Sequence, residues 1–488
     1  MILLLHIAAV LIAFASIAWA AAPSWTKAKR QDASGQHVYE ILGRFDLTMW
    51  QGIKKFFGYV SEIAHQTLSL DQKEKSSFVW IRVLFSYTIA VLHRTMLSAR
   101  LSDNQMDYVL GANDQETESV SKAELESLVE RIKFAHLAYP FHRDHNKLEE
   151  RLQEKGFLLI QHDPITSPGK VAHYIAIHQQ QKRLLIVPRG TSAFSDLLTD
   201  AAGYTVEQEL SRCDDAPVLE GLERIWSHEG ILTAANRLSN DTIELVRRYV
   251  TEDGYKLELV GHSLGASVAT LMGAMFLAQI PALRDPSNLH IWAYAPPPCL
   301  NQEASDALEP FISTIVWNDD IIPTLSIASI TFTSTIMAHL DEQVRINRGK
   351  FALLTAIFAA AATMLGFRKA PIAIPEQRLD DMAEYSLKYT QSLHAEWRND
   401  TATYPPKIYA PGKVMYLWER RHLNKSTGEV NGVMAQGSSF LHLQLVIPTK
   451  DSIASHFPGS YEQGMQRLLS QMGDKTEHRR SIFLRLGN

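Results

Sequence analysis

Five consecutive residues, Gly261 to Gly265, contain the motif G-x-S-x-G with Ser263 at its centre. The apolar stretch 256–260 before the motif is typical of a buried strand, and the small residues that open 265–280 are typical of a packed helix. A sharp turn from strand to helix needs glycines, because the backbone and the neighbouring helix come close together there. Such a turn lifts the serine hydroxyl clear of the sheet, so we predict that Ser263 is a nucleophile.

A serine hydroxyl is a weak nucleophile at neutral pH, and it needs a base that is itself oriented by a third group. Where the nucleophile lies on a turn of this kind, an acid and then a histidine follow it in the chain. Asp320 comes soon after the apolar stretch 312–317, near the carboxyl end of a predicted strand, where ligand-facing residues lie. Its neighbour Asp319 is the alternative acid, and position alone leaves both open.

Several histidines follow Asp320, and one of them should be the base. His442 lies inside the apolar run 440–448 and is expected in the middle of a strand. His456 comes after that run and before a helix predicted at 460–470, which places it in a loop at the active edge of the sheet. We therefore select His456. The remaining candidates are His339, His394, His422 and His478.

The tetrahedral intermediate of acyl transfer carries a negative oxygen, which N–H donors must stabilise. The residue after the nucleophile usually supplies one donor, and here it is Leu264. The second donor is expected from the loop after an earlier strand, where the apolar stretch 183–188 runs into Arg189-Gly190-Thr191. Thr191 is the candidate in this loop, and its hydroxyl group could add to the oxyanion hole.

Strands and helices alternate along the chain from about residue 121 onward. This alternation predicts βαβ units and a mostly parallel sheet, which is the α/β class. With a nucleophile turn on such a sheet, the expected architecture is an α/β-hydrolase fold. The predicted strands lie at 157–161, 172–178, 183–188, 256–260, 289–295 and 312–317, and the predicted helices lie at 121–139, 231–250 and 265–280.

The chain has 488 residues, which is too long for one hydrophobic core and predicts more than one unit. We interpret the apolar stretch 1–22 as a signal peptide or an uncleaved membrane anchor. Residues 23–120 are expected to form a helical N-terminal region and an acidic linker. The apolar run 78–91 within them fits a membrane-embedded helix or a buried one. We place the catalytic domain at 121–488.

The stretch between Asp320 and His456 contains far more chain than one crossover needs, so an insertion is expected at about 326–404. Its apolar run 351–367 is bracketed by basic residues. A helix in this run would cap the site, dip into lipid, or form a buried part of the insertion. The sequence leaves these alternatives open.

Composition excludes several classes of function. The net charge is −5 and no basic block is present, so a nucleic-acid partner is not expected. Two cysteines, Cys213 and Cys299, allow one disulfide or two free thiols. The Cys and His residues do not have zinc-site spacing, so we expect no metal and no other cofactor. The oligomeric state stays open.

Several motifs resemble, in the same order, those of the class 3 (fungal-type) lipases. Residues 186–191 resemble the oxyanion segment of this family, and residues 259–266 resemble its nucleophile segment closely. Residues 318–323 and 455–458 continue the pattern around the acid and the histidine. The last of these segments, together with Tyr461, looks most like the diacylglycerol-lipase branch of the family.

The resemblance covers roughly residues 120–470, implies the α/β-hydrolase fold and favours Asp320 over Asp319. It implies a lipase that cleaves carboxylic esters of acylglycerols, preferably diacylglycerol, at a membrane or droplet surface. Alternatives are a phospholipase A1 or galactolipase type of activity, acyl transfer to an acceptor other than water, and a catalytically silent membrane-binding scaffold. The expected location is a membrane of the endoplasmic reticulum or secretory pathway, or outside the cell after signal cleavage.

Overall fold

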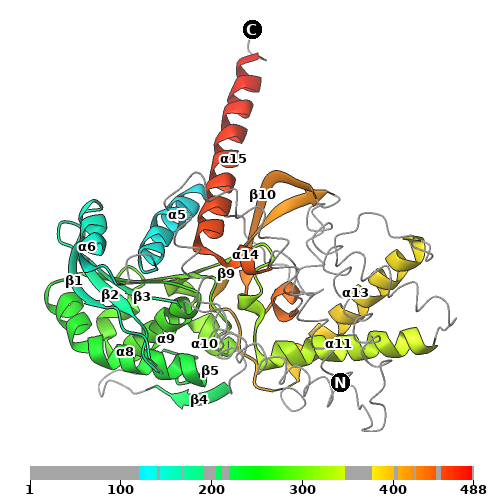
Figure 1. Ribbon diagram of the computed structural model, residues 1–488, viewed down its shortest axis with the longest axis horizontal. Coiled ribbons are helices and arrows are strands. Elements are labelled where there is room, and N and C mark those ends of the chain that lie inside the picture. Colours follow the sequence, from blue (N-terminus) through cyan, green and yellow to red (C-terminus); the bar gives the residue numbers. More distant parts are fainter. Residues whose placement is uncertain are drawn as a thin grey trace.

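The computed structural model describes most of the chain from residue 120 onward (Figure 1). Predictions made for residues 1–119 and for the apolar run 351–367 lie outside the described residues. Among the helices of the described part, none is both long enough and apolar enough to cross a membrane. The described residues are 120–139, 143–167, 169–190, 205–210, 219–346, 376–400, 405–422, 425–446 and 452–485.

Eight strands form one sheet in the order β1-β2-β3-β6-β7-β8-β9-β10. The inner strands from β3 to β9 pair in parallel, whereas the strands at the two edges pair antiparallel. The prediction of an α/β fold with a mostly parallel central sheet is therefore confirmed. The strands are β1 (Leu158–Asp163), β2 (His173–His178), β3 (Arg183–Pro188), β6 (Lys256–His262), β7 (Leu289–Tyr294), β8 (Ile312–Trp317), β9 (Lys413–His422) and β10 (Lys425–Gln436).

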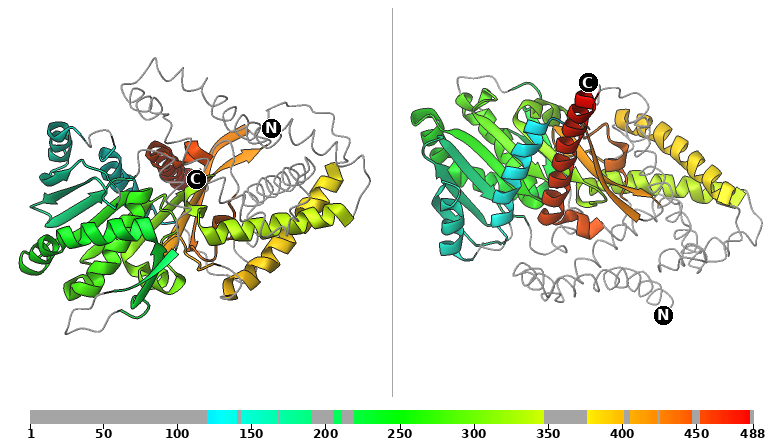
Figure 2. Two further views of the ribbon diagram at one scale, coloured as in Figure 1. Left: turned by 60° about the horizontal axis from the view of Figure 1, so that its bottom comes forward. Right: turned by 90° about the horizontal axis from the view of Figure 1, so that it is seen from above.

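Helices cover both faces of this sheet (Figure 2). The helices α8 (Glu229–Arg247) and α9 (Leu264–Gln279) share one core layer, and α5 (Lys122–Leu137) and α15 (Pro458–Arg485) share the other. Successive strand residues point to opposite layers, so Leu185 belongs to the second layer and Ile186 to the first. Because both faces are covered, the central strands are apolar along most of their length. A shorter helix, α6 (His145–Gln153), packs near β1.

A separate two-stranded sheet precedes α8. It consists of β4 (Thr205–Glu209) and β5 (Arg224–His228), which pair antiparallel. The sequence does not predict these strands, because β4 is largely polar and only partly buried. The pairing is therefore specified by the partner strand more than by a local apolar pattern.

Between β8 and β9 the chain forms two long helices, α11 (Ile327–Ile346) and α13 (Glu376–Asn399), which we call the arm. The arm lies within the stretch where an insertion is expected, and Figure 1 shows it on the opposite side of the molecule from β1 and β2. Buried side chains of the arm, Phe332 and Trp397, join a third core that also contains strand residues such as Tyr416. The arm thus shares a core with β8, β9 and β10, at one end of the sheet.

Two local predictions near the end of the chain are wrong. The apolar run that begins at Phe440, predicted as a strand, instead forms the 3-10 helix η6 (Leu441–Gln444), and His442 lies within it. The run is apolar because Phe440 and its neighbours are buried in the third core, and a short apolar run of this kind does not distinguish a strand from a buried turn. His456 ends the short helix α14 (Ser452–His456) instead of lying in a loop.

Candidate active site

Ser263 lies at the turn from β6 into α9. Its backbone has a φ of 59° and a ψ of −135°, a conformation that residues with a side chain seldom adopt and that the surrounding structure must impose. A Cβ atom added at Gly261 would overlap the Gly265 carbonyl, and one added at Gly265 would overlap the Pro188 carbonyl. Close backbone contacts therefore require both glycines of the motif.

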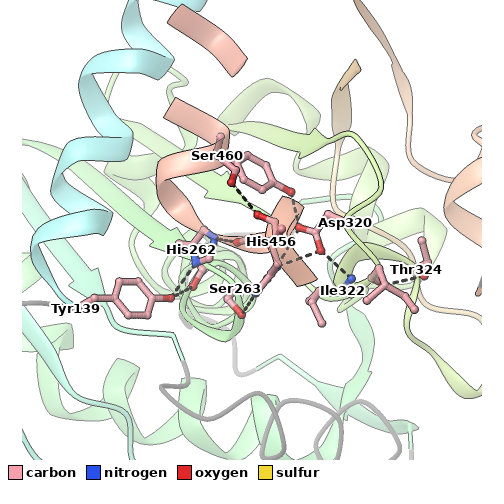
Figure 3. Close-up of polar contacts among 11 residues, drawn as sticks. Tyr139, His262, Ser263, Asp320, Ile322, Thr324, His456 and Ser460 are labelled. Atoms are coloured by element: carbon pink, nitrogen blue, oxygen red, sulfur yellow. Dashed lines mark hydrogen bonds and ion pairs between the residues drawn. The ribbon is translucent and has the colours of Figure 1, made fainter. Parts of the chain in front are cut away.

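Ser263, His456 and Asp320 form a chain of hydrogen bonds (Figure 3). Ser263 Oγ lies 2.9 Å from His456 Nε2, and His456 Nδ1 lies 2.9 Å and 3.1 Å from the two carboxylate oxygens of Asp320. Because an ionised carboxylate only accepts hydrogen bonds, the proton of a neutral ring is on Nδ1, and Nε2 accepts the serine O–H. This arrangement can remove the serine proton and orient the base that takes it.

Asp320 is almost fully buried, with 1% of its surface exposed. The backbone N–H of Ile322 donates to its Oδ1 atom at 2.9 Å, and the Tyr461 hydroxyl donates to its Oδ2 atom at 2.6 Å. These donors and His456 compensate the cost of removing a carboxylate from water. Asp319, the alternative acid, is only half-buried. The structure therefore places Asp320 against the histidine ring.

Tyr461 is a residue of the site to which the sequence assigns no role. It is fully buried near the start of α15, and burial, followed by the nearby charge of Asp320, raises the pKa of its hydroxyl well above the usual value. The hydroxyl therefore keeps its proton and acts as a donor to the carboxylate. The sequence signals Tyr461 only through its closeness to His456 and its part in the resemblance to the diacylglycerol-lipase branch, and neither of these indicates that its hydroxyl contacts Asp320.

The expected oxyanion donors are only partly described. Leu264 is the first residue of α9, so its N–H is one of the helix-terminal donors that have no partner within the helix. Thr191 lies outside the described residues, and its role stays a prediction. Gly190, which directly precedes it, lies against the nucleophile turn, because an added Cβ there would be 3.1 Å from Ser263 Cβ. The start of the predicted oxyanion loop is therefore next to the serine.

Metal ligands do not cluster in the part of the chain that the structure describes. No group of three or more His, Cys, Asp or Glu side chains there is arranged to hold a metal ion. Cys299 is buried in the core layer of α8 and α9, and Cys213 lies outside the described residues. Cys299 is a free thiol in the structure, so the disulfide that two cysteines would allow is not formed at this residue.

Sequence comparisons find known proteins that are similar to this chain. Residues 185–330 match the family described as Lipase (class 3). Diacylglycerol lipase-beta of Mus musculus is 29% identical over 185 residues, which cover 37% of this chain and 25% of the mouse protein. Diacylglycerol lipase-alpha of Homo sapiens is 27% identical over 256 residues, which cover 50% of this chain and 22% of the human protein. The chain thus matches about a quarter of the length of these relatives.

A fungal lipase and a solved fungal structure also match. The lipase of Rhizopus niveus is 30% identical over 155 residues, which cover 31% of this chain and 36% of the fungal protein. The structure of lipase II from Rhizopus niveus is 22% identical, with a TM-score of 0.36, and covers 44% of this chain and 80% of that chain. The family match contains Ser263 and Asp320 and ends before His456. The family match and the sequence relatives show that this chain is similar to the class 3 lipases and, among them, to the diacylglycerol lipases.

Proposed function

We propose that this chain is a lipase that hydrolyses carboxylic ester bonds of acylglycerols, with diacylglycerol as its favoured substrate. The observation that carries the proposal is the hydrogen-bonded chain from Ser263 Oγ through His456 to the buried carboxylate of Asp320. Similarity to class 3 lipases supports lipase activity. Similarity to the diacylglycerol lipases supports the choice of substrate.

In the proposed acylation step, Ser263 Oγ attacks the ester carbonyl carbon while its proton passes to His456 Nε2. Asp320 stabilises the imidazolium that forms. The oxygen of the tetrahedral intermediate accepts hydrogen bonds from the Leu264 N–H and from Thr191. When the intermediate collapses, the ester C–O bond breaks, and His456 returns the proton to the departing alcohol. The products of this step are an acyl-enzyme and, from diacylglycerol, a monoacylglycerol.

In the proposed deacylation step, water attacks the acyl carbonyl carbon and gives a proton to His456 Nε2. The bond between the carbonyl carbon and Ser263 Oγ then breaks, the proton returns to the serine, and a fatty acid leaves. An alcohol in place of water would receive the acyl group through the same residues. Transfer to such an acceptor is therefore the alternative that depends only on which molecule reaches the acyl-enzyme.

We further propose that the protein acts at a membrane or lipid-droplet surface of the endoplasmic reticulum or secretory pathway. The support is the apolar character of residues 1–22 and 351–367, both outside the described residues. Apolar segments flanked by basic residues bind anionic membrane surfaces through burial and charge together. Fractionation of cells that express the tagged full chain, with an alkaline wash, would distinguish membrane association from secretion.

The proposal is tested by combining a fluorophosphonate probe with a lipid panel. The wild-type chain should be labelled and should release fatty acid fastest from diacylglycerol, whereas Ser263→Ala should do neither. Labelling of the alanine variant at the wild-type rate would show that another residue is the nucleophile. Faster release from a phospholipid or a galactolipid would replace the proposed substrate. If the wild-type chain were neither labelled nor able to hydrolyse any lipid of the panel, the alternative of a catalytically silent membrane-binding scaffold would be favoured.

A further inference from the structure

The hydroxyl of Tyr139 points at His262, the residue before the nucleophile (Figure 3). It is 2.8 Å from His262 Nδ1 and 3.4 Å from the His262 carbonyl oxygen. It also accepts the backbone N–H of Gly190, at the start of the predicted oxyanion loop. Burial raises the pKa of this hydroxyl, so it keeps its proton and can donate. Tyr139 follows the end of α5, and no step of the proposed reaction involves it.

His262 is the motif residue directly before Ser263, and its ring is buried. Its Nε2 atom lies 2.8 Å from the main-chain carbonyl oxygen of His456. A carbonyl oxygen only accepts hydrogen bonds, so Nε2 carries the ring proton and Nδ1 accepts the proton of Tyr139. Burial holds the pKa of the His262 ring well below its usual value, so the ring is neutral. Each ring nitrogen therefore has one matched partner.

This pair of hydrogen bonds connects the nucleophile to the base by a second route. The first route is the direct bond between Ser263 Oγ and His456 Nε2. The second route runs through the backbone, because His262 is covalently joined to Ser263 and its ring binds the carbonyl of His456. The carbonyl lies at the end of the short helix α14, where orphan carbonyls need donors. The second route therefore fixes the backbone that carries the base.

We propose that Tyr139 is a positioning residue for the reaction: its hydroxyl holds His262 in the tautomer whose Nε2–H anchors the backbone of His456 beside Ser263. In the other tautomer, Nε2 would face the carbonyl with a lone pair, the anchor would be lost, and the base could drift from the serine. Misplacement of a catalytic group by about 1 Å can lower a rate by roughly 100-fold. This role rests on the proposed serine chemistry.

A purely structural role is the alternative, and the chain offers a matched control for it. The hydroxyl of Tyr174 is also buried and donates at 2.8 Å to a carbonyl of α5, that of Phe134, without touching the site. Tyr174→Phe should therefore reproduce any loss of stability that comes from deleting a buried hydroxyl. It should leave kcat for a soluble ester unchanged. Tyr139→Phe, in contrast, should have a lower kcat than Tyr174→Phe.

The test is a double-mutant cycle between Tyr139→Phe and His262→Gln in the full chain. The amide nitrogen of glutamine takes the place of ring Nε2 and can donate only, so it needs no partner to fix a tautomer. We expect Tyr139→Phe alone to lower kcat for a soluble short-chain ester by about 10- to 100-fold, with KM and melting temperature close to those of Tyr174→Phe. In the His262→Gln background, Tyr139→Phe should lower kcat for the same ester by no more than about twofold.

Three results would overturn the proposal. The first is a Tyr139→Phe chain with wild-type kcat. The second is an equal loss in both backgrounds, which would mean that Tyr139 acts through Gly190. The third is a His262→Phe chain that is as active as His262→Gln, and this comparison holds even if Tyr139→Phe does not fold. A wild-type chain that neither hydrolyses the ester nor reacts with a fluorophosphonate would instead overturn the proposed function, and this inference with it.

Discussion

The nucleophile turn and the arm of α11 and α13 differ in how they are held. From residue 257 to residue 278, which includes the turn, every residue is buried. Between residues 388 and 399 of the arm, the buried side chains form one stripe of Thr390, His394 and Trp397. The turn is therefore supported from all sides, and α13 from one side only. A strained backbone such as that of Ser263 can persist only in the first kind of surroundings.

The two regions meet beside Asp320. The backbone N–H of Ile322 donates to this carboxylate, and Ile322 begins a 3-10 turn, η5 (Ile322–Thr324), that leads into α11. The arm can therefore affect ester hydrolysis mainly through the loop that carries Asp320 and leads into α11. We expect changes in the core around the turn to disable the reaction, and changes in the arm to alter access to lipid.

The largest effect should come from His456. His456→Ala should lower ester hydrolysis by about four orders of magnitude or more, since the serine would lose its base. His442→Ala is the control, because His442 is buried in the core that holds the arm and bonds the Tyr416 hydroxyl at 2.8 Å. That variant should lose about 1–3 kcal/mol of stability and keep most of its activity. Substantial hydrolysis by His456→Ala would remove this residue from the reaction.

The second-largest effect should come from filling the close contact between Gly265 of the nucleophile turn and the Pro188 carbonyl. In Gly265→Ala the new methyl group would collide with the Pro188 carbonyl, so we expect a loss of about 1–3 kcal/mol in the free energy of unfolding and slower fluorophosphonate labelling. Gly459→Ala is the matched control, since nothing lies within 4 Å of the added atom. Thermal melts and labelling rates would check both variants. If Gly265→Ala were as stable and reactive as Gly459→Ala, the turn would be less crowded than we infer.

A smaller effect should follow the loss of the Tyr461 hydroxyl. Tyr461→Phe would leave Asp320 with one donor fewer, and we expect kcat to fall by about tenfold, the equivalent of roughly 1.4 kcal/mol. Tyr294→Phe serves for comparison, because its buried hydroxyl donates at 2.6 Å to the Leu128 carbonyl, away from the acid. Equal kcat values for the two variants would mean that the hydroxyl of Tyr461 is only structural.

The smallest effect on the chemistry should come from the apolar run 351–367, which lies between α11 and α13 in the sequence. Replacing residues 351–367 by a short Gly/Ser linker should leave hydrolysis of a small soluble ester unchanged and lower the activity on diacylglycerol in vesicles. Burying one Leu- or Phe-sized side chain in lipid is worth about 1.5–3 kcal/mol, and the segment contains several. Higher activity on vesicles would identify the segment as a cap. Equal losses on both substrates, with a lower melting temperature, would place it in the core and erase the contrast between the two regions.

The sequence predicts well those elements whose pattern is local. The strands β3, β6, β7 and β8 follow from local apolar runs, the turn at Ser263 follows from its glycine motif, and His456 follows from chain order. The choice of Asp320 over Asp319 rests on the resemblance to the class 3 lipases, and the parallel strand β9 is not predicted. The run at Phe440 shows the limit, because burial from all sides produces the same composition as a central strand. The strand β10 shows another limit: it contains Gly428 and Gly432, and its pairing with β9 specifies it more than its own composition does.

The partners of the candidate residues are beyond prediction from one sequence. Tyr461 and Asp320 are separated by 141 positions, and Tyr139 and His262 by 123. Each of these contacts needs the relative placement of α5, α15 and the sheet, which no local pattern contains. The roles of Ser263, Asp320 and His456 themselves stay proposals that the variants above address, although the structure brings the three side chains together.

The separation of 193 residues between Ser263 and His456 also affects when a newly made chain can become reactive. Translation proceeds from the N-terminus, and domains fold as their sequence becomes complete. The strand, the turn and the helix around Ser263 are therefore finished long before the ribosome reaches the codon for His456. During that interval the serine has no base. A growing chain with the proposed activity would therefore be inert toward ester substrates until His456 is in place, without a separate inhibitory segment.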